Sequence, residues 1–363
     1  MPQNSIAELL VPELAQLAAY TTVHGDYAVR LDANEAAPLL GNAARARLAE
    51  VAGQCAWERY PDARAGELRQ AIAKHCSVGA DEVLVGAGSD ELITMLLTAL
   101  GRPRVAGQPA TLLTTTPTFV MYKLSARVRG WRAIEVPLDA DWDLNVEQLL
   151  RAVEFSPPNL IFIASPNNPT SKSASRERLE ALIRAAPGAL VVIDEAYVDY
   201  AERDQLDLYR AHENVAILRT LSKVGFAALR VGWLIARPQL IGEIDKTRLP
   251  YNLPSLSQRL GALVLDELSA ELSGLVALIK RQRELMAKKL AALPRLGVTA
   301  SDANFFWVHT EKPASEIFAA LRERGILVRS FHERGGRLAH QLRITIGTES
   351  ENAALLAALA EVT

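Results

Sequence analysis

The segment LIFIASPNNPT, residues 160–170, joins a run of five apolar residues to a polar loop that contains two asparagines. The same pattern returns twice, because VVIDEAY (191–197) and ILRTLSK (217–223) also lead from apolar residues into polar ones. Short aliphatic runs separated by one helix length of chain are typical of βαβ units, and nearly all-apolar strands are typical of a parallel sheet covered on both faces. The sequence therefore predicts an α/β fold.

Polar side chains follow each of these three predicted strands. Asn168 comes after the first strand, Asp194 and Tyr197 after the second, and Ser222 and Lys223 after the third. The spacings, 26 residues from Asn168 to Asp194 and 29 from Asp194 to Lys223, each fit one βα unit. Because ligands of open α/β sheets bind beyond the carboxyl ends of the strands, we expect an amide, a carboxylate, a phenol and an amine to converge there.

The rest of the chain extends this sheet and then changes character. From Pro254 to about Ala292 the pattern predicts one long helical stretch, and residues 326–329 are predicted to form a strand. We divide the chain into a large domain with a mainly parallel, seven-stranded type of sheet flanked by helices, and a smaller α+β domain formed by both chain ends. The bounds are 44–265 for the large domain, and 1–43 together with 266–363 for the small one.

The segment EVLVGAGSDELI (82–93) predicts a strand, a turn and the start of a helix. The first amides of that helix belong to Gly88, Ser89 and Asp90, and free amides at a helix N-terminus bind phosphate. A dinucleotide fingerprint would need glycine or alanine where Glu91 stands, and no Lys-Ser/Thr pair completes a Walker loop. An ordinary helix cap remains an alternative for this segment taken alone.

A pyridoxal-phosphate enzyme requires an amine beside a carboxylate, with a phosphate-binding site nearby. Lys223 would form the Schiff base, Asp194 would keep the pyridine nitrogen protonated, and Asn168 and Tyr197 could donate to the ring oxygen. Other lysines compete poorly, because they occupy amphipathic helices, loops or element ends. The nine lysines are those at 74, 123, 172, 223, 246, 280, 288, 289 and 312.

Several segments resemble a known family. SPNNPT, VVIDEAYVDY and RTLSKVGFAALRVGW are similar to signature segments of the fold type I, class I/II pyridoxal-phosphate aminotransferases and, within them, of the histidinol-phosphate aminotransferases. Supporting matches are LDANE, RYPD, VGAGSDELI, PTFVMY, SDANFFWV and LRITIGT, so the resemblance covers nearly the whole chain. Three departures are Ser171, where the family pattern NPTG has glycine, Phe119 in place of the commoner tyrosine, and the spacing from Lys223 to Arg230, which is one residue shorter than in many relatives. A salt bridge at the domain face remains an alternative to a phosphate role for Arg230.

This resemblance implies roles for individual residues. Lys223, Asp194 and Tyr197 would be catalytic, and Phe119 would stack on the cofactor ring. Tyr60 would reach across from a second subunit, which implies a homodimer with a shared active site. The cofactor-binding set would be Gly88, Ser89, Asp90, Phe119, Asn168, Asp194, Tyr197, Ser222, Lys223, Arg230 and Tyr60.

The family's reaction is a transamination in two halves. One site would accept both histidinol phosphate and glutamate, the latter giving 2-oxoglutarate, and arginine binds phosphate or carboxylate through the same planar fork. We expect Arg343 and Arg329 to bind substrate, with Asn34 and Tyr122 beside them. Arg337 is a weaker candidate, expected to be a solvated turn residue.

Other functions stay open at this point. On the same scaffold, the protein could be an aromatic amino-acid aminotransferase or a threonine-phosphate decarboxylase, and from a different class a catalytically idle binding module or the effector domain of a regulator.

Composition limits the partners. Lys+Arg 40 against Asp+Glu 42 gives a net charge of −2, which disfavours nucleic acid and anionic membranes as partners. The six histidines and two cysteines show no metal-ligand spacing, so we expect no metal. We see neither a signal peptide nor a membrane span, and we expect a cytoplasmic protein.

Overall fold

The computed structural model describes residues 6–16, 23–37 and 40–363. Its larger lobe is built on a seven-stranded sheet of order β2-β8-β7-β6-β5-β3-β4, in which β8 runs antiparallel to both neighbours and the other pairs are parallel. This mixed α/β sheet confirms the predicted fold class. The strands are β2 (Val83–Ala87), β3 (Thr111–Thr116), β4 (Arg132–Pro137), β5 (Leu160–Ala164), β6 (Leu190–Asp194), β7 (Val215–Thr220) and β8 (Val231–Ile235).

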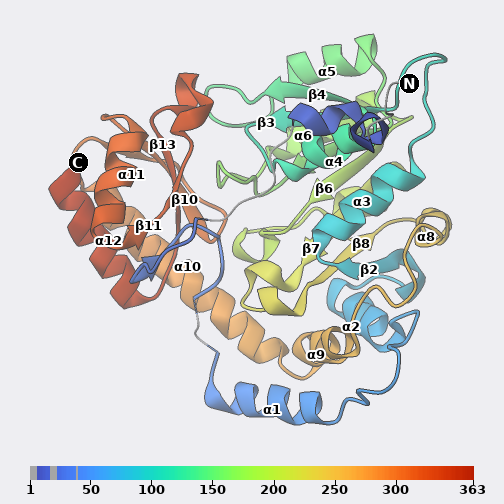
Figure 1. The fold of residues 1–363 in the computed structure, drawn as a ribbon, viewed down its shortest axis with the longest axis horizontal. Coiled ribbons are helices and arrows are strands. Elements are labelled where there is room, and N and C mark those ends of the chain that lie inside the picture. The colour runs from blue at the N-terminus through green and yellow to red at the C-terminus, as the bar shows by residue number, and fades with distance from the viewer. Residues whose placement is uncertain (1–5, 17–22, 38–39) are drawn as a thin grey trace.

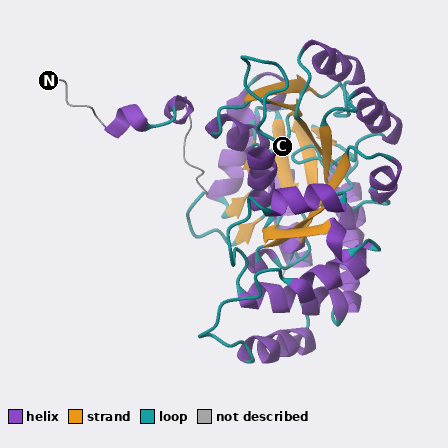
Figure 2. Ribbon diagram, turned by 90° about the vertical axis from the view of Figure 1, so that its right-hand side faces the viewer, coloured by secondary structure: helices purple, strands orange, loops and turns teal. Residues whose placement is uncertain are grey.

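The central strands are apolar on both faces because helices cover both. Along β5, Ile161 and Ile163 face one layer of helices, whereas Phe162 faces the other, and all three side chains are buried. The first layer consists of α2, α5, α6, α7 and α9, and the second of α3, α4 and α8. Figure 2 shows the strands at the centre with helices on either side.

The helices have the following bounds: α1 Asn42–Gly53, α2 Gly66–Cys76, α3 Ser89–Ala99, α4 Met121–Val128, α5 Val146–Phe155, α6 Arg176–Ala185, α7 Leu206–Ala211, α8 Pro238–Asp245, α9 Ser255–Asp266, α10 Ser269–Ala291, α11 Ala314–Glu323 and α12 Glu349–Val362.

The smaller lobe contains an antiparallel sheet of order β12-β13-β10-β9 and a parallel pair, β1 with β11. Because β1 comes from the N-terminal part of the chain, both ends of the sequence contribute strands to this lobe. Helix α10 runs from the larger lobe to the smaller one (Figure 1). The bounds of its strands are β1 Val29–Arg30, β9 Leu296–Val298, β10 Phe305–Thr310, β11 Ile326–Leu327, β12 Arg329–Ser330 and β13 Gln341–Thr345. The domain bounds of the sequence analysis remain a prediction, and residues 1–5, 17–22 and 38–39 of the predicted small domain lie outside the described residues.

Two sequence predictions need correction. The long helix from Pro254 is two helices, because the chain leaves helical geometry at Leu268 (φ −100°, ψ 20°), where α9 ends its packing against α1 and α2 and α10 turns toward the smaller lobe. The strand at 326–329 is likewise two strands in different sheets, since β11 pairs with β1 and β12 pairs with β13.

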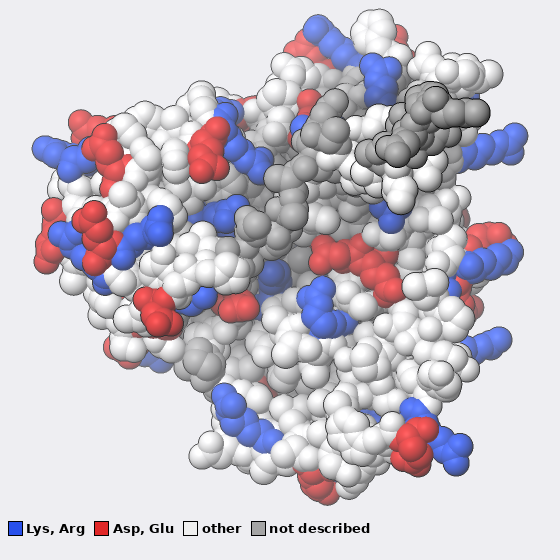
Figure 3. Space-filling view, viewed as in Figure 1, with Lys and Arg blue, Asp and Glu red and all other residues white. Residues whose placement is uncertain are grey.

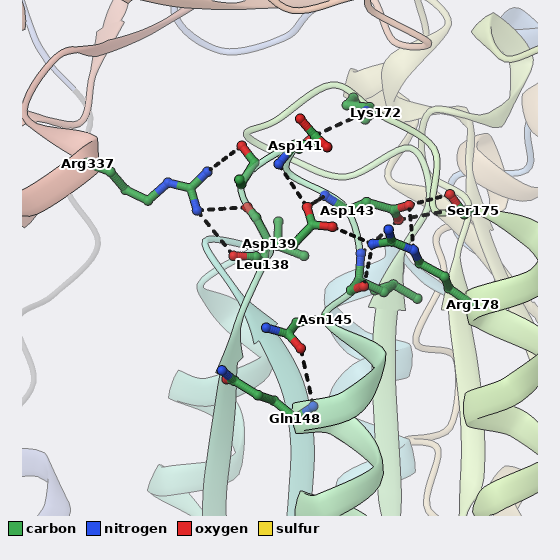
Figure 4. Close-up of polar contacts among 12 residues, drawn as sticks. Leu138, Asp139, Asp141, Asp143, Asn145, Gln148, Lys172, Ser175, Arg178 and Arg337 are labelled. Carbon is green, nitrogen blue, oxygen red and sulfur yellow. Dashed lines mark hydrogen bonds and ion pairs between the residues drawn. The ribbon is translucent and has the colours of Figure 1, made fainter.

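Arg337 is exposed in the 3₁₀ turn Gly336–Leu338, as the sequence predicts, but it also makes contacts that the sequence does not indicate. From the smaller lobe it donates hydrogen bonds to the carbonyl oxygens of Leu138 (3.2 Å), Asp139 (2.8 Å) and Ala140 (3.1 Å) in the larger lobe (Figure 4). Its guanidinium carbon lies 3.4 Å from the ring centroid of Trp142. This contact joins the two lobes at the loop between β4 and α5.

Candidate active site

A cavity of about 490 Å³ lies at the carboxyl ends of β5, β6 and β7 and is closed on one side by the smaller lobe. The structure brings Asn168, Asp194, Tyr197, Ser222 and Lys223 together in its lining. Basic and acidic side chains are interspersed over the face shown in Figure 3. The cavity lining itself contains both basic and acidic side chains, among them Lys223 and Asp194, although the whole molecule is nearly neutral.

Asp194 is the last residue of β6, and its side chain is almost completely buried. Its Oδ2 accepts a hydrogen bond of 2.5 Å from the hydroxyl of Tyr122, and its Oδ1 accepts one of 3.0 Å from the amide of Ala196. Burial raises the pKa of Asp194 to about 6, and these two hydrogen bonds oppose the rise because they favour the ionised form. A carboxylate of this kind suits a cationic partner inside the cavity.

Asn168 and Tyr197 are each held by a side chain of the other lobe. Arg343, on β13, donates from Nη1 to Oδ1 of Asn168 at 2.6 Å, and its Nη2 donates to the carbonyl oxygen of Asp32. Asn34 donates from Nδ2 to the Tyr197 hydroxyl at 3.0 Å. Because the oxygen of Asn168 is engaged by Arg343, the amide hydrogens of Asn168 are left to donate elsewhere.

Asn34 is expected from the sequence to bind substrate, yet it is 1% exposed and adopts a left-handed backbone, with φ of 55°. Its backbone amide and its Oδ1 both contact the Thr345 hydroxyl, and its carbonyl oxygen accepts from Asn304. Asn34 therefore contacts protein groups of both lobes and also lines the cavity, so its predicted contact with substrate stays a prediction.

Lys223 ends the short 3₁₀ turn that follows β7, Leu221–Lys223. The hydroxyl of Thr220 accepts from the Ser222 amide at 3.1 Å and so caps this turn. Tyr200 donates to the carbonyl oxygen of Lys223 at 2.7 Å, and the Lys223 amine lies 5.8 Å from the ring centroid of Tyr197. The backbone of the lysine is thus fixed, and its amine is directed to the cavity side of Tyr197.

The start of α3, which follows the turn after β2, also contributes to the cavity lining, through Ser89 and Asp90. Gly88 has φ of 80°, and a Cβ there would lie 2.5 Å from Nη2 of Arg230. Arg230 also contacts the carboxylate of Asp90, at 3.5 Å, and both side chains are about half exposed. A Cβ on Gly232 would lie 2.6 Å from the amide of Ser89. Glycine at positions 88 and 232 therefore allows the turn before α3 to pack closely against Arg230 and β8. As a result, the N-terminus of α3 lies beside the guanidinium group of Arg230.

Phe119 and Tyr122 also line the cavity. Phe119 packs edge-on against Tyr122, with 5.5 Å between ring centroids. The Tyr122 side chain is buried, and its hydroxyl donates to Asp194. Its predicted contact with substrate stays a prediction.

Arg329 and Arg343 line the cavity from the smaller lobe. Arg334 lies there too and was missed by the sequence analysis, because nothing in the polar run HERGGR distinguishes it from a solvated arginine. Tyr60 is outside the cavity lining of this single chain. Its side chain is 81% exposed and stacks on Tyr251, with ring centroids 4.6 Å apart.

The residues present fit pyridoxal phosphate. A lysine amine, a buried carboxylate, an amide, a phenol and a helix N-terminus with an adjacent arginine share one cavity. Within the described ranges, no group of three or more histidine, cysteine, aspartate or glutamate side chains could hold a metal ion. No helix in the described part of the chain has the length and apolar character needed to cross a bilayer.

This fold and this site define an aminotransferase. The sequence model of the family "Aminotransferase class I and II" matches residues 28–359, so the chain belongs to that family and is a pyridoxal-phosphate-dependent aminotransferase. Within it, the chain is 38% identical to the histidinol-phosphate aminotransferase of Chromobacterium violaceum, over 98% of both chains. It is 37% identical to histidinol-phosphate aminotransferase 2 of Nitrosococcus oceani, over 99% of this chain and 98% of the relative.

A solved structure supports the same relationship. The crystal structure of histidinol-phosphate aminotransferase from Sinorhizobium meliloti, in complex with pyridoxal-5′-phosphate, matches with a TM-score of 0.84 and 26% identity, over 97% of each chain.

Proposed function

We propose that this aminotransferase transfers the amino group between L-histidinol phosphate and 2-oxoglutarate, giving imidazole-acetol phosphate and glutamate, as a step of histidine biosynthesis. The names of the relatives at 37 and 38% identity support this activity. The observation in the structure that carries it is the row of arginines, Arg329, Arg334 and Arg343, on the small-lobe side of the cavity that also contains Lys223. Guanidinium groups bind phosphate and carboxylate alike, and both substrates are anions.

The cofactor supplies an electron sink for the carbanion that forms when the substrate loses its α-proton. Lys223 would hold the cofactor covalently as a Schiff base and, once displaced by the substrate amine, would move a proton between the substrate's Cα and the cofactor's C4′. Asp194 would hold a proton on the ring nitrogen, as its burial beside the cavity supports.

Asn168 and Tyr197 would donate to the ring oxygen. Support comes from their small-lobe partners, since the Asn168 oxygen already accepts from Arg343 and the Tyr197 oxygen from Asn34. Phe119 would lie against the ring face.

The 5′-phosphate would be held by the amides of Gly88 and Ser89, the Ser222 hydroxyl and Arg230, with Asp90 orienting the arginine. The helix N-terminus and the 3.5 Å contact between Arg230 and Asp90 support this assignment.

We also propose a cytoplasmic homodimer in which Tyr60 completes the phosphate site of the second subunit. Its ring is 81% exposed, so it is available to a second chain. If Tyr60→Phe leaves cofactor affinity unchanged in a confirmed dimer, this role is wrong.

A coupled assay with histidinol phosphate and 2-oxoglutarate tests the activity, with phenylalanine and threonine phosphate as competing substrates and carbon dioxide release as the sign of a decarboxylase. We expect the highest kcat/KM for histidinol phosphate and no carbon dioxide. The wild-type protein should be yellow, and Lys223→Ala should lose the visible absorbance of the covalent cofactor. A higher kcat/KM for either competitor would refute the substrate assignment.

A further inference from the structure

We propose that Tyr122 is a positioning residue for Asp194, whose phenol keeps the carboxylate ionised and oriented toward the cofactor's ring nitrogen. The inference rests on the proposed role of Asp194. It replaces the substrate-binding role that the sequence suggests for Tyr122.

The packing around Tyr122 directs its hydroxyl toward one partner, the carboxylate of Asp194. Tyr122 lies in the first turn of α4, is 0% exposed and stacks on Phe162 of β5, with ring centroids 4.6 Å apart and 3° between planes. The edge contact with Phe119 restrains the same ring from the cavity side. The hydroxyl, 2.5 Å from Oδ2 of Asp194, is therefore held against the carboxylate and is not free to turn toward a substrate.

The direction of the hydrogen bond follows from the two groups. Burial and the adjacent carboxylate raise the pKa of Tyr122 well above the ordinary value of a phenol, so the phenol stays protonated and donates. The ionised Asp194 can only accept.

The other groups that act on Asp194 are few. The amide of Ala196 donates to Oδ1, the charge of Lys223 favours the ionised carboxyl, and the charge of Asp90 disfavours it. Burial is the largest influence and favours the neutral acid. Without the Tyr122 hydroxyl, the hydrogen bond from the Ala196 amide would be the only one left to oppose the effect of burial, so the pKa of Asp194 would rise. Asp194 would then become a neutral acid at a higher pH than in the wild type.

The test is Tyr122→Phe, which keeps the ring and its stacking. Tyr209→Phe is a matched control, because Tyr209 is also buried and donates its hydroxyl to a carboxylate, that of Glu82, outside the cavity lining. Both variants and the wild type are prepared as apoprotein, checked by thermal unfolding, and titrated with pyridoxal phosphate from pH 5 to 8.5.

In the wild type, we expect affinity for pyridoxal phosphate to fall as the pH drops through the pKa of Asp194. In Tyr122→Phe the midpoint of that fall should move up by about one pH unit, the size expected for one hydrogen bond to a buried charge. Tyr209→Phe should leave the midpoint in place. When Tyr122→Phe is added to Asp194→Asn, the midpoint should no longer move, since the amide at position 194 does not titrate in this range.

Three results would overturn the inference: an unchanged midpoint in Tyr122→Phe, an equal shift in Tyr209→Phe, or an equal shift when Tyr122→Phe is added to Asp194→Asn. An unchanged midpoint with a raised KM for histidinol phosphate would instead restore the substrate-binding role of Tyr122. Failure of the wild type to bind pyridoxal phosphate at any pH would refute the proposed function as well, so the two failures are distinguishable.

Discussion

The contact of Arg337 with the larger lobe leads to a quantitative prediction for Arg337→Ala. The substitution removes three hydrogen bonds to backbone carbonyls and the contact with the ring of Trp142. Arg337 is an exposed residue, so water can reach the vacated carbonyls, and each hydrogen bond contributes only about 0.5 kcal/mol. The cation–π contact at such a site adds about 0.5–1 kcal/mol. We expect a loss of about 2 kcal/mol in the free energy of unfolding.

The same contact should matter to catalysis, because the smaller lobe also carries Arg329 and Arg343. If Arg337→Ala destabilised only the arrangement in which the two lobes are in contact, by the full loss of about 2 kcal/mol, the KM for histidinol phosphate would rise about 30-fold. This factor is the upper limit of the expected effect. The kcat should change little, since Arg337 is outside the cavity lining.

Urea unfolding and steady-state kinetics measure the two effects. Arg324→Ala is the matched control, because Arg324 is an exposed arginine of the same lobe whose ion pair, with Glu361 at 3.3 Å, stays within that lobe. It should change stability by about 0.5 kcal/mol or less and leave KM unchanged. Arg337→Lys keeps the charge without the planar fork and should fall between the two. The reasoning is refuted if Arg337→Ala behaves like Arg324→Ala in both measurements.

Three further substitutions test local geometry. Gly232→Ala places a methyl group 2.6 Å from the Ser89 amide, and should weaken pyridoxal-phosphate binding about tenfold or more; unchanged affinity by apoprotein titration would show that this turn does not hold the phosphate. Ser171→Gly should stabilise the protein by about 1 kcal/mol in urea, because Ser171 has φ of 61° and a buried hydroxyl that has no hydrogen-bond partner among the described residues; a loss of stability would contradict this, and Ser171→Ala separates the hydroxyl from the strain. Arg219→Met removes the guanidinium that lies 2.7 Å from the buried carboxylate of Glu195, and should lower the free energy of unfolding in urea by about 3–5 kcal/mol. A loss below about 1 kcal/mol would show that the ion pair is dispensable.

Much of the larger lobe could be predicted from the sequence because its strands are buried on both faces. Residues 160–164 are apolar without interruption, and the structure confirms β5 with these bounds. The convergence of Asp194 and Lys223 followed from the same regularity, since parallel strands one βα unit apart must present their carboxyl ends at one edge.

Contacts between distant parts of the chain had no such local signal. Arg337 and the carbonyl of Asp139 are 198 residues apart, and Asn34 and Tyr197 are 163 apart. The break at Leu268 was missed for a related reason. Its apolar side chain fits a helical pattern, and the chain turns there because the next helix packs against the other lobe.

Asn34 and Tyr122 show a different limit of sequence reasoning. Both lie in segments that resemble the family's motifs, and the resemblance suggested direct contact with substrate. In the structure, Asn34 contacts Tyr197 and Tyr122 contacts Asp194. A resemblance to a motif suggests a role for a residue, but it does not indicate which side chain that residue contacts. Both residues also line the cavity, so their predicted contact with substrate stays a prediction.

Side chains of the two lobes therefore contact each other directly within the site. Arg343 engages the oxygen of Asn168, and Asn34 donates to the oxygen of Tyr197, so small-lobe side chains set which hydrogens of these large-lobe groups remain available. A displaced small lobe would release both groups at once, whereas Asp194 would keep its bond to Tyr122, which lies wholly within the larger lobe. Loss of the Arg337 contact should consequently affect substrate binding and the positions of Asn168 and Tyr197, while the contact between Asp194 and Tyr122 stays intact.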